Sequence, residues 1–153
     1  MTKLLMVCMA NTCRSPMAQA IARKLAVEAG VEPPFEVDCA GTHAHHLGER
    51  PDRRAALTLA RHGYEMGRVR SRRIAEQDFQ SFDLILAMDS HNLTELRRLC
   101  PLEQTHKLHL LLDFAEEVNE VDVPDPYYGN QAGFDHVLAL CEAGAKGLIR
   151  RFL

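Results

Sequence analysis

The fold is decided by the stretch KLLMVCMANTCRSPMAQA at residues 3–20. It opens with the apolar run Lys3–Val7, which is typical of a fully buried strand. After a short loop, Ser15 and Pro16 indicate a helix start, with Ser15 as the N-cap and Pro16 at the first helical position. The stretch therefore predicts a strand, a tight loop and a helix in immediate succession.

Apolar runs and helical patterns keep alternating to the end of the chain. Further strands are expected at residues 35–40, 83–88 and 107–112, and helices at 15–30, 52–63, 89–101 and 134–152. Gly30 can end the first helix, and Asp52 and Asp89 are cap candidates for the second and third. Strands that alternate with helices imply right-handed crossovers and a parallel sheet. We therefore expect a single α/β domain over residues 1–153: a four-stranded parallel β-sheet with helices on both faces and an anion-binding loop after the first strand.

Composition excludes several classes of protein. The 153 residues are 46% hydrophobic and 25% charged, so the chain can bury one core and is neither disordered nor collagen-like. A pI near 6.2 argues against binding nucleic acid by bulk charge. No run is long enough to span a membrane, and the apolar run before Cys8 is too short for a secretory signal. An odd set of five cysteines indicates reduced thiols in a cytoplasmic protein: Cys8, Cys13, Cys39, Cys100 and Cys141.

The loop after the first strand is predicted to bind an anion and to contain a nucleophile. Backbone N–H groups and the positive end of the following helix dipole favour a bound anion and favour thiolate over thiol at Cys8. Arg14 can bind two phosphoryl oxygens through its planar guanidinium, and Ser15 can donate to the sulfur. A Cys six residues before an Arg also arises by chance, and a buried Cys is often only a small apolar residue. The strand before, the Ser-Pro start after and Asn11 within favour catalysis, and a nucleotide-binding GxxxxGK[ST] motif is absent.

A phosphoryl-accepting nucleophile needs an acid for the leaving oxygen, and the best candidate lies in VPDPYYG at residues 123–129. Two prolines stiffen the backbone around Asp125, and Tyr127 and Tyr128 could form the wall for an aromatic substrate. The alternative is a solvated turn, because Asp and Pro are ordinary turn residues.

Taken together, these motifs resemble the low-molecular-weight protein tyrosine phosphatase family, bacterial branch. The likeness covers the whole chain, in order: Cys8–Pro16, Ala40–Thr42, Asp52 with Arg54, Phe82–Asp89 and Asp125–Gly129. The resemblance implies tyrosine-phosphorylated proteins as partners, with a bacterial tyrosine kinase among them, and no cofactor. We expect no nucleic-acid or membrane partner and a monomer or weak homodimer.

The resemblance also implies a role for each site residue. Cys8 attacks phosphorus and becomes a phosphocysteine, Ser15 stabilises the departing thiolate, and Asp125 acts first as acid and then as base. Asn11 adopts a strained left-handed conformation, and Cys13 forms a protective disulfide with Cys8 under peroxide. The phosphate-binding groups are Arg14 and the backbone N–H groups of Met9, Ala10, Asn11, Thr12, Cys13 and Arg14.

Departures from the family pattern fall around the loop. Ala10 stands where Gly is usual, Cys39 where Ser is usual and Val69 where His is usual. The last two positions normally support Asn11, so we expect a looser loop and lowered activity. His45 stands where a bulky aromatic commonly lines the pocket mouth, which leaves substrate preference open.

Other clusters in the sequence have weaker implications. Cys39, His43, His45 and His46 match no standard zinc spacing, so no metal is expected. Arginines are concentrated in the middle third of the chain, and acidic residues in a later stretch. One interpretation is that both clusters are solvated helix faces. The other is that the arginines line the side of the pocket and favour acidic phosphopeptides. The two sets are Arg50, Arg53, Arg54, Arg61, Arg68, Arg70, Arg72 and Arg73, and Asp113, Glu116, Glu117, Glu120, Asp122 and Asp125.

Two alternative functions remain open at this stage. The substitutions around the loop could leave a phosphate-binding module with weak turnover. A thiol-linked arsenate reductase would use a similar loop, but it needs a closely spaced resolving cysteine pair, and Cys100 stands alone in its region.

Overall fold

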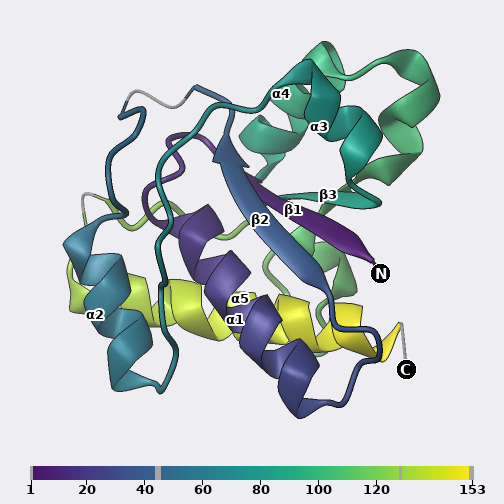
Figure 1. Ribbon diagram of the computed structural model, residues 1–153. Coiled ribbons are helices and arrows are strands. Elements are labelled where there is room, and N and C mark those ends of the chain that lie inside the picture. Colours follow the sequence, from purple (N-terminus) through teal and green to yellow (C-terminus); the bar gives the residue numbers. More distant parts are fainter. Residues whose placement is uncertain (1, 44–45, 128, 152–153) are drawn as a thin grey trace.

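The structure, a computed structural model, describes residues 2–43, 46–127 and 129–151 (Figure 1). Four parallel strands form one sheet in the order β2-β1-β3-β4, which confirms the predicted architecture. The strands are β1 (Lys3–Cys8), β2 (Glu36–Gly41), β3 (Leu84–Ala87) and β4 (Leu108–Leu110). The helices are α1 (Arg14–Glu28), α2 (Arg53–Arg61), α3 (Glu76–Ser81), α4 (Ser90–Leu99) and α5 (Gln131–Arg150), with short 3-10 helices η1 (Leu102–Lys107) and η2 (Leu111–Phe114).

Helices cover both faces of the sheet, as expected for a parallel sheet with apolar strands. Alternate residues of β1 point to opposite faces: Leu4 and Met6 pack in one core with α1, α2 and α5, whereas Leu5 and Val7 pack in a second core with α3 and α4. Because β1 is central, its last residue, Cys8, lies at the carboxyl edge of the sheet, where ligands bind in such folds. No helix in the described ranges is long and apolar enough to cross a membrane.

Local capping signals predicted several element ends correctly. Asp52 and Asp89 cap α2 and α4 by accepting a hydrogen bond from Arg54 N and Asn92 N, respectively. Gly30, after α1, has a φ of 74° and closes the helix as expected.

Two predictions of local structure were wrong, and one short helix was not predicted. Helix α1 begins at Arg14, so Ser15 lies inside the first turn and Cys13 occupies the N-cap position with no side-chain cap bond. The fourth strand is only three residues long, because the apolar run continues as η2. Helix α3 was missed; at six residues it is too short to show helical periodicity.

Candidate active site

The loop between β1 and α1 wraps around the sulfur of Cys8. Cys8 is 3% exposed, and its Sγ accepts a hydrogen bond from Asn11 N at 3.3 Å and lies 3.1 Å from Ser15 Oγ. Ser15 is buried in the first turn of α1, two residues further into the helix than predicted. The displacement brings its hydroxyl to the sulfur, where it can donate to a thiolate.

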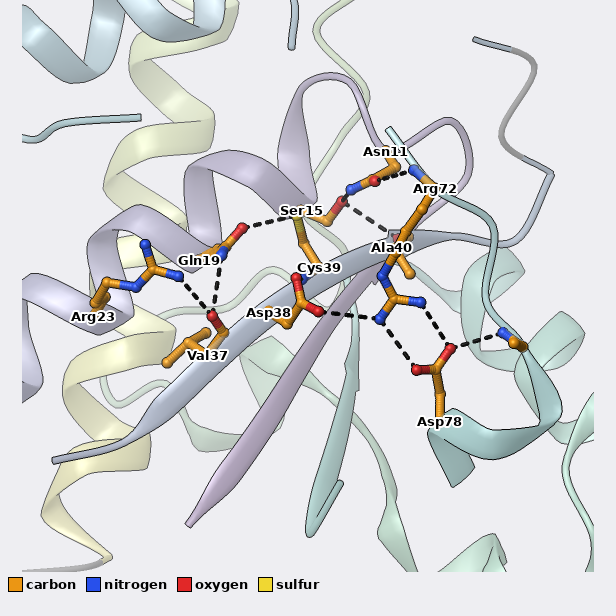
Figure 2. Close-up of polar contacts among 11 residues, drawn as sticks. Asn11, Ser15, Gln19, Arg23, Val37, Asp38, Cys39, Ala40, Arg72 and Asp78 are labelled. Carbon is orange, nitrogen blue, oxygen red and sulfur yellow. Dashed lines mark hydrogen bonds and ion pairs between the residues drawn. The ribbon is translucent and has the colours of Figure 1, made fainter. Parts of the chain in front are cut away.

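Asn11 adopts the left-handed conformation that the resemblance implied, with a φ of 60°. Such a conformation costs a non-glycine residue on the order of 1–3 kcal/mol unless its surroundings stabilise it. Both ends of the Asn11 side chain are bonded: Nδ2 donates to Ser15 Oγ at 2.8 Å, and Oδ1 accepts from Arg72 N at 2.9 Å (Figure 2). The side chain thus links the loop to helix α1 and to the segment before α3.

Arg72 itself is held by two carboxylates. Its guanidinium donates to both oxygens of Asp78, at 2.9 and 3.1 Å, and to Asp38 at 3.3 Å (Figure 2). The neighbouring Ser71 donates from its hydroxyl to Ala10 O at 3.0 Å. The segment at 71–72 therefore supports two successive loop residues, a role that the sequence analysis did not identify.

Of the two departures at the expected support positions, Cys39 bonds Gln19 and still lies beside the Asn11 side chain, which lowers the pKa of Cys39 against the larger effect of burial, whereas Val69 is apolar. The Cys39 thiol donates to Gln19 Oε1 at 2.9 Å (Figure 2), and burial raises its pKa to about 12, so that it stays protonated. Val69 packs against the larger core. Asn11 keeps bonded partners at both ends in the presence of these substitutions.

Gly41, at the end of β2, permits the loop to approach the sheet closely. A Cβ at this position would lie 2.6 Å from Met9 O, closer than real contacts allow. The next two residues, Thr42 and His43, donate backbone hydrogen bonds to Cys8 O and Met9 O at 2.9 Å each. Only glycine fits where the strand meets the loop.

Arg14 is a buried cation at the floor of the site. It is 4% exposed, and its Nη1 bonds Asp89 Oδ2 at 2.5 Å and Val123 O at 3.1 Å. Burial lowers the pKa of Arg14, but the neighbouring Cys8 and the bonded Asp89 outweigh that effect and raise it, so the guanidinium remains charged. Its Nη2 lies 3.9 Å from Asp125 Oδ2.

The segment that carries Asp125 is fixed to the end of β3. Val123 N donates to Met88 O at 2.8 Å, and Ser90 donates from its N and Oγ to Asp122 Oδ1 at 2.9 and 2.8 Å. The carboxyl of Asp125 accepts from Tyr127 N at 3.0 Å and is 42% exposed. A carboxyl so oriented and open to solvent can exchange protons with a substrate and with water.

These elements enclose a pocket of about 180 Å³, lined by Cys8, Met9, Ala10, Thr12, Cys13, Arg14, His46, Asp125 and Tyr127. The predicted wall residue Tyr127 is among them, with the guanidinium of Arg54 5.5 Å from its ring centre. His46, which the sequence analysis had assigned to no pocket, also lines it. The other two predicted pocket residues, His45 and Tyr128, lie outside the described residues.

Comparison with known proteins identifies the family. The sequence pattern of the family described as low molecular weight phosphotyrosine protein phosphatase matches residues 3–152. The chain belongs to this family. The site described above is therefore the site of a low molecular weight phosphatase, a hydrolase of phosphotyrosine.

Known members of the family are similar to this chain over almost its whole length. A low molecular weight protein-tyrosine-phosphatase of Synechocystis is 42% identical over 96% of this chain and 94% of its own. The Bacillus subtilis phosphatase YfkJ is 39% identical over 97% and 94%. The crystal structure of a protein tyrosine phosphatase from Entamoeba histolytica superposes with a TM-score of 0.95 at 36% identity, covering 99% of this chain and 96% of that one.

Replacing Asp89 by Asn tests the support of Arg14 in this phosphatase. Asn caps helices as well as Asp, so Asp89→Asn keeps α4 and removes only the charge opposite Arg14. We expect kcat/KM for para-nitrophenyl phosphate to fall about 10- to 100-fold and inhibition by inorganic phosphate to weaken, because misplacing a binding group by about 1 Å can cost this much. Asp113→Asn, at a capping carboxylate in η2, is the matched control and should leave both unchanged. Unaltered phosphate inhibition in Asp89→Asn would show that Arg14 does not depend on Asp89.

Proposed function

We propose that the protein hydrolyses phosphotyrosine in proteins through a phosphocysteine on Cys8, with Asp125 as general acid and base. The Cys8 thiolate attacks phosphorus, the bond to the phenolic oxygen breaks, and Asp125 supplies the proton to that oxygen. Water then attacks the phosphocysteine, Asp125 takes a proton from it, and phosphate leaves with the thiolate restored. The observation that carries this proposal is that Cys8, Arg14 and Asp125 line one pocket.

Binding of the phosphoryl group is assigned to the loop. Its backbone N–H groups at residues 9–14 and the Arg14 guanidinium would contact the three equatorial oxygens, which gain negative charge in the transition state. The Ser15 hydroxyl, 3.1 Å from Cys8 Sγ, would stabilise the sulfur as a leaving group. The three catalytic groups and the two bonds of Asn11 favour turnover over a module that only binds phosphate.

Two substitutions test the assignment. Cys8→Ser should abolish hydrolysis of para-nitrophenyl phosphate, and Asp125→Ala should slow it by about 10²–10⁴-fold, the usual contribution of general acid catalysis. Glu120→Gln, an exposed carboxylate in the same acidic stretch, is the control and should retain wild-type turnover. Full activity in Cys8→Ser would refute the proposal, and phosphate binding without turnover in the wild-type protein would favour the binding module.

A second candidate substrate is phosphoarginine. The crystal structure of a Drosophila arginine phosphatase superposes with a TM-score of 0.91 at 32% identity, covering 99% of this chain and 98% of that one. In this chain the half-buried Thr12 and the acid Asp125 both line the pocket. The guanidinium of a phosphoarginine substrate has N–H groups that can donate hydrogen bonds to a hydroxyl or a carboxylate, whereas the ring of phosphotyrosine has no such donor.

Thr12→Val removes the hydroxyl and nearly keeps the shape, so it separates the two substrates. If the protein acts on phosphoarginine, the variant should lower kcat/KM for a phosphoarginine peptide about 10-fold, because an acceptor is lost from a buried donor. Hydrolysis of the matched phosphotyrosine peptide should stay the same or rise. A wild-type protein that leaves the phosphoarginine peptide intact would exclude this second candidate.

Cys13 is proposed as the redox partner of Cys8. Both thiols are free and line the same pocket. Peroxide would oxidise Cys8 Sγ to the sulfenic acid, and Cys13 Sγ would displace water from it to form a disulfide that a thiol reductant reopens. Burial and the neighbouring Asp52 raise the pKa of Cys13 to about 12, so disulfide formation should be faster at higher pH, where more Cys13 is thiolate.

Phosphoproteins carrying phosphotyrosine are the partners that this activity requires, and we propose that a bacterial tyrosine kinase is one of them. Five free cysteines support a location in a reducing compartment, the cytoplasm.

A further inference from the structure

A second hollow, of about 920 Å³, lies between the start of α2 and the segment at 66–70 that follows this helix. Figure 1 shows the chain after α2 running back alongside that helix towards the sheet. Arginines from both sides surround an apolar floor: the lining includes Arg50, Arg53, Arg68 and Arg70 around Met66 and Val69. We call these four arginines with the two floor residues the basic hollow.

The four guanidinium groups of the basic hollow pair with no carboxylate in the described part of the chain. All four arginines are exposed, and within residues 2–43, 46–127 and 129–151 none forms an ion pair. Two acidic residues beside them in sequence have other partners, since Glu49 pairs with His46 and Asp52 with Arg54, and the exposed Glu65 forms no ion pair with these arginines among the described residues. Four like charges in a chain of net charge −3 make this hollow a local site for anions.

The segment 50–54 connects the basic hollow to residues of the active-site pocket. Arg50, Pro51 and Arg53 line the hollow, whereas Asp52 and Arg54 bond residues that line the pocket. Asp52 N donates to Thr12 O at 2.8 Å, and Arg54 Nη2 donates to Tyr127 O at 2.8 Å. A peptide bound at Cys8 would therefore need to cross only this short segment to reach the arginines, and an extended chain advances about 3.3 Å per residue.

We propose that the basic hollow binds an acidic segment of the phosphoprotein substrate, close in sequence to the phosphorylated residue. This inference rests on the proposed function and adds its substrate preference. Arginine forks bind carboxylates in bidentate geometry, and the apolar floor would contact the methylenes of Asp and Glu side chains. None of the described residues that line the hollow is aromatic and able to stack on bases, which favours an acidic peptide over a single-stranded nucleic acid. The arginines of the middle third were expected either to line the pocket or to lie on solvated faces; among the described residues that line the pocket, the one arginine is Arg14.

A matched pair of phosphotyrosine peptides tests the proposal, one with Asp and Glu flanking the phosphotyrosine and one with Ser and Gly in their place. We expect the wild-type protein to have a lower KM for the acidic peptide than for the neutral one. This difference should disappear as the salt concentration is raised. The double variant Arg53→Gln/Arg68→Gln removes one charge from each side of the hollow. It should lower kcat/KM for the acidic peptide about 3- to 10-fold, which is the effect expected from losing two exposed ion pairs. The neutral peptide and para-nitrophenyl phosphate should be unaffected.

The control protein carries Arg61→Gln with Arg97→Gln, which removes the same charge from exposed arginines outside the hollow. It should behave as the wild type, whereas an equal loss in the control would assign the effect to net charge and overturn the proposal. Equal rates for both peptides, alongside normal hydrolysis of para-nitrophenyl phosphate, would also overturn it while leaving the proposed function intact. An oligonucleotide that inhibits at lower concentration than an unphosphorylated acidic peptide would show that the hollow prefers nucleic acid. Failure to hydrolyse para-nitrophenyl phosphate would instead refute the proposed function.

Discussion

The ion pair between Arg14 and Asp89 joins the parts of the molecule that form the active site. Arg14 is almost fully buried, and an unpaired charge in such a place would destabilise the fold by about 3–5 kcal/mol. Asp89 supplies the opposite charge from the end of β3, and Val123 supplies a carbonyl from the segment that carries the acid. One guanidinium thus holds together the start of α1, the start of α4 and the segment before Asp125, which lie far apart in the sequence.

A second set of contacts fixes the conformation of the loop at Asn11. Asn11 is held in its left-handed conformation by Ser15 and by the backbone of Arg72. Because Arg72 is bonded to Asp38 and Asp78, the position of the loop depends on β2 and α3 as well as on its own helix. Under the proposed function, a loop held in this way would need little rearrangement to bind the phosphoryl group, which is the condition for strong stabilisation of a developing negative charge. The substitutions at 39 and 69 leave these two bonds in place, so whether activity is lowered depends on how rigidly they hold Asn11.

Local signals explain what could be predicted from the sequence. Helix caps such as Asp52 and the glycine after α1 act within a few residues, so they are visible in the sequence and were placed correctly. The meeting of Cys8 and Asp125 in one pocket followed from the resemblance, because no local pattern links residues so far apart. The support from Arg72 was missed for the same reason: it reaches Asn11 across 61 residues through a backbone N–H that carries no sequence signal. Asp89 was identified only as a cap, because its second role depends on a partner 75 residues away.

A crystal structure of the protein with orthovanadate, an analogue of the phosphoryl group in transfer, would show whether Cys8, Arg14 and Asp125 act together on one phosphoryl group. We expect vanadium bonded to Cys8 Sγ, three equatorial oxygens in contact with the loop N–H groups and Arg14, and an apical oxygen facing Asp125. Vanadate bound away from Cys8, or bound there with Arg14 and Asp125 out of contact, would contradict the proposed mechanism.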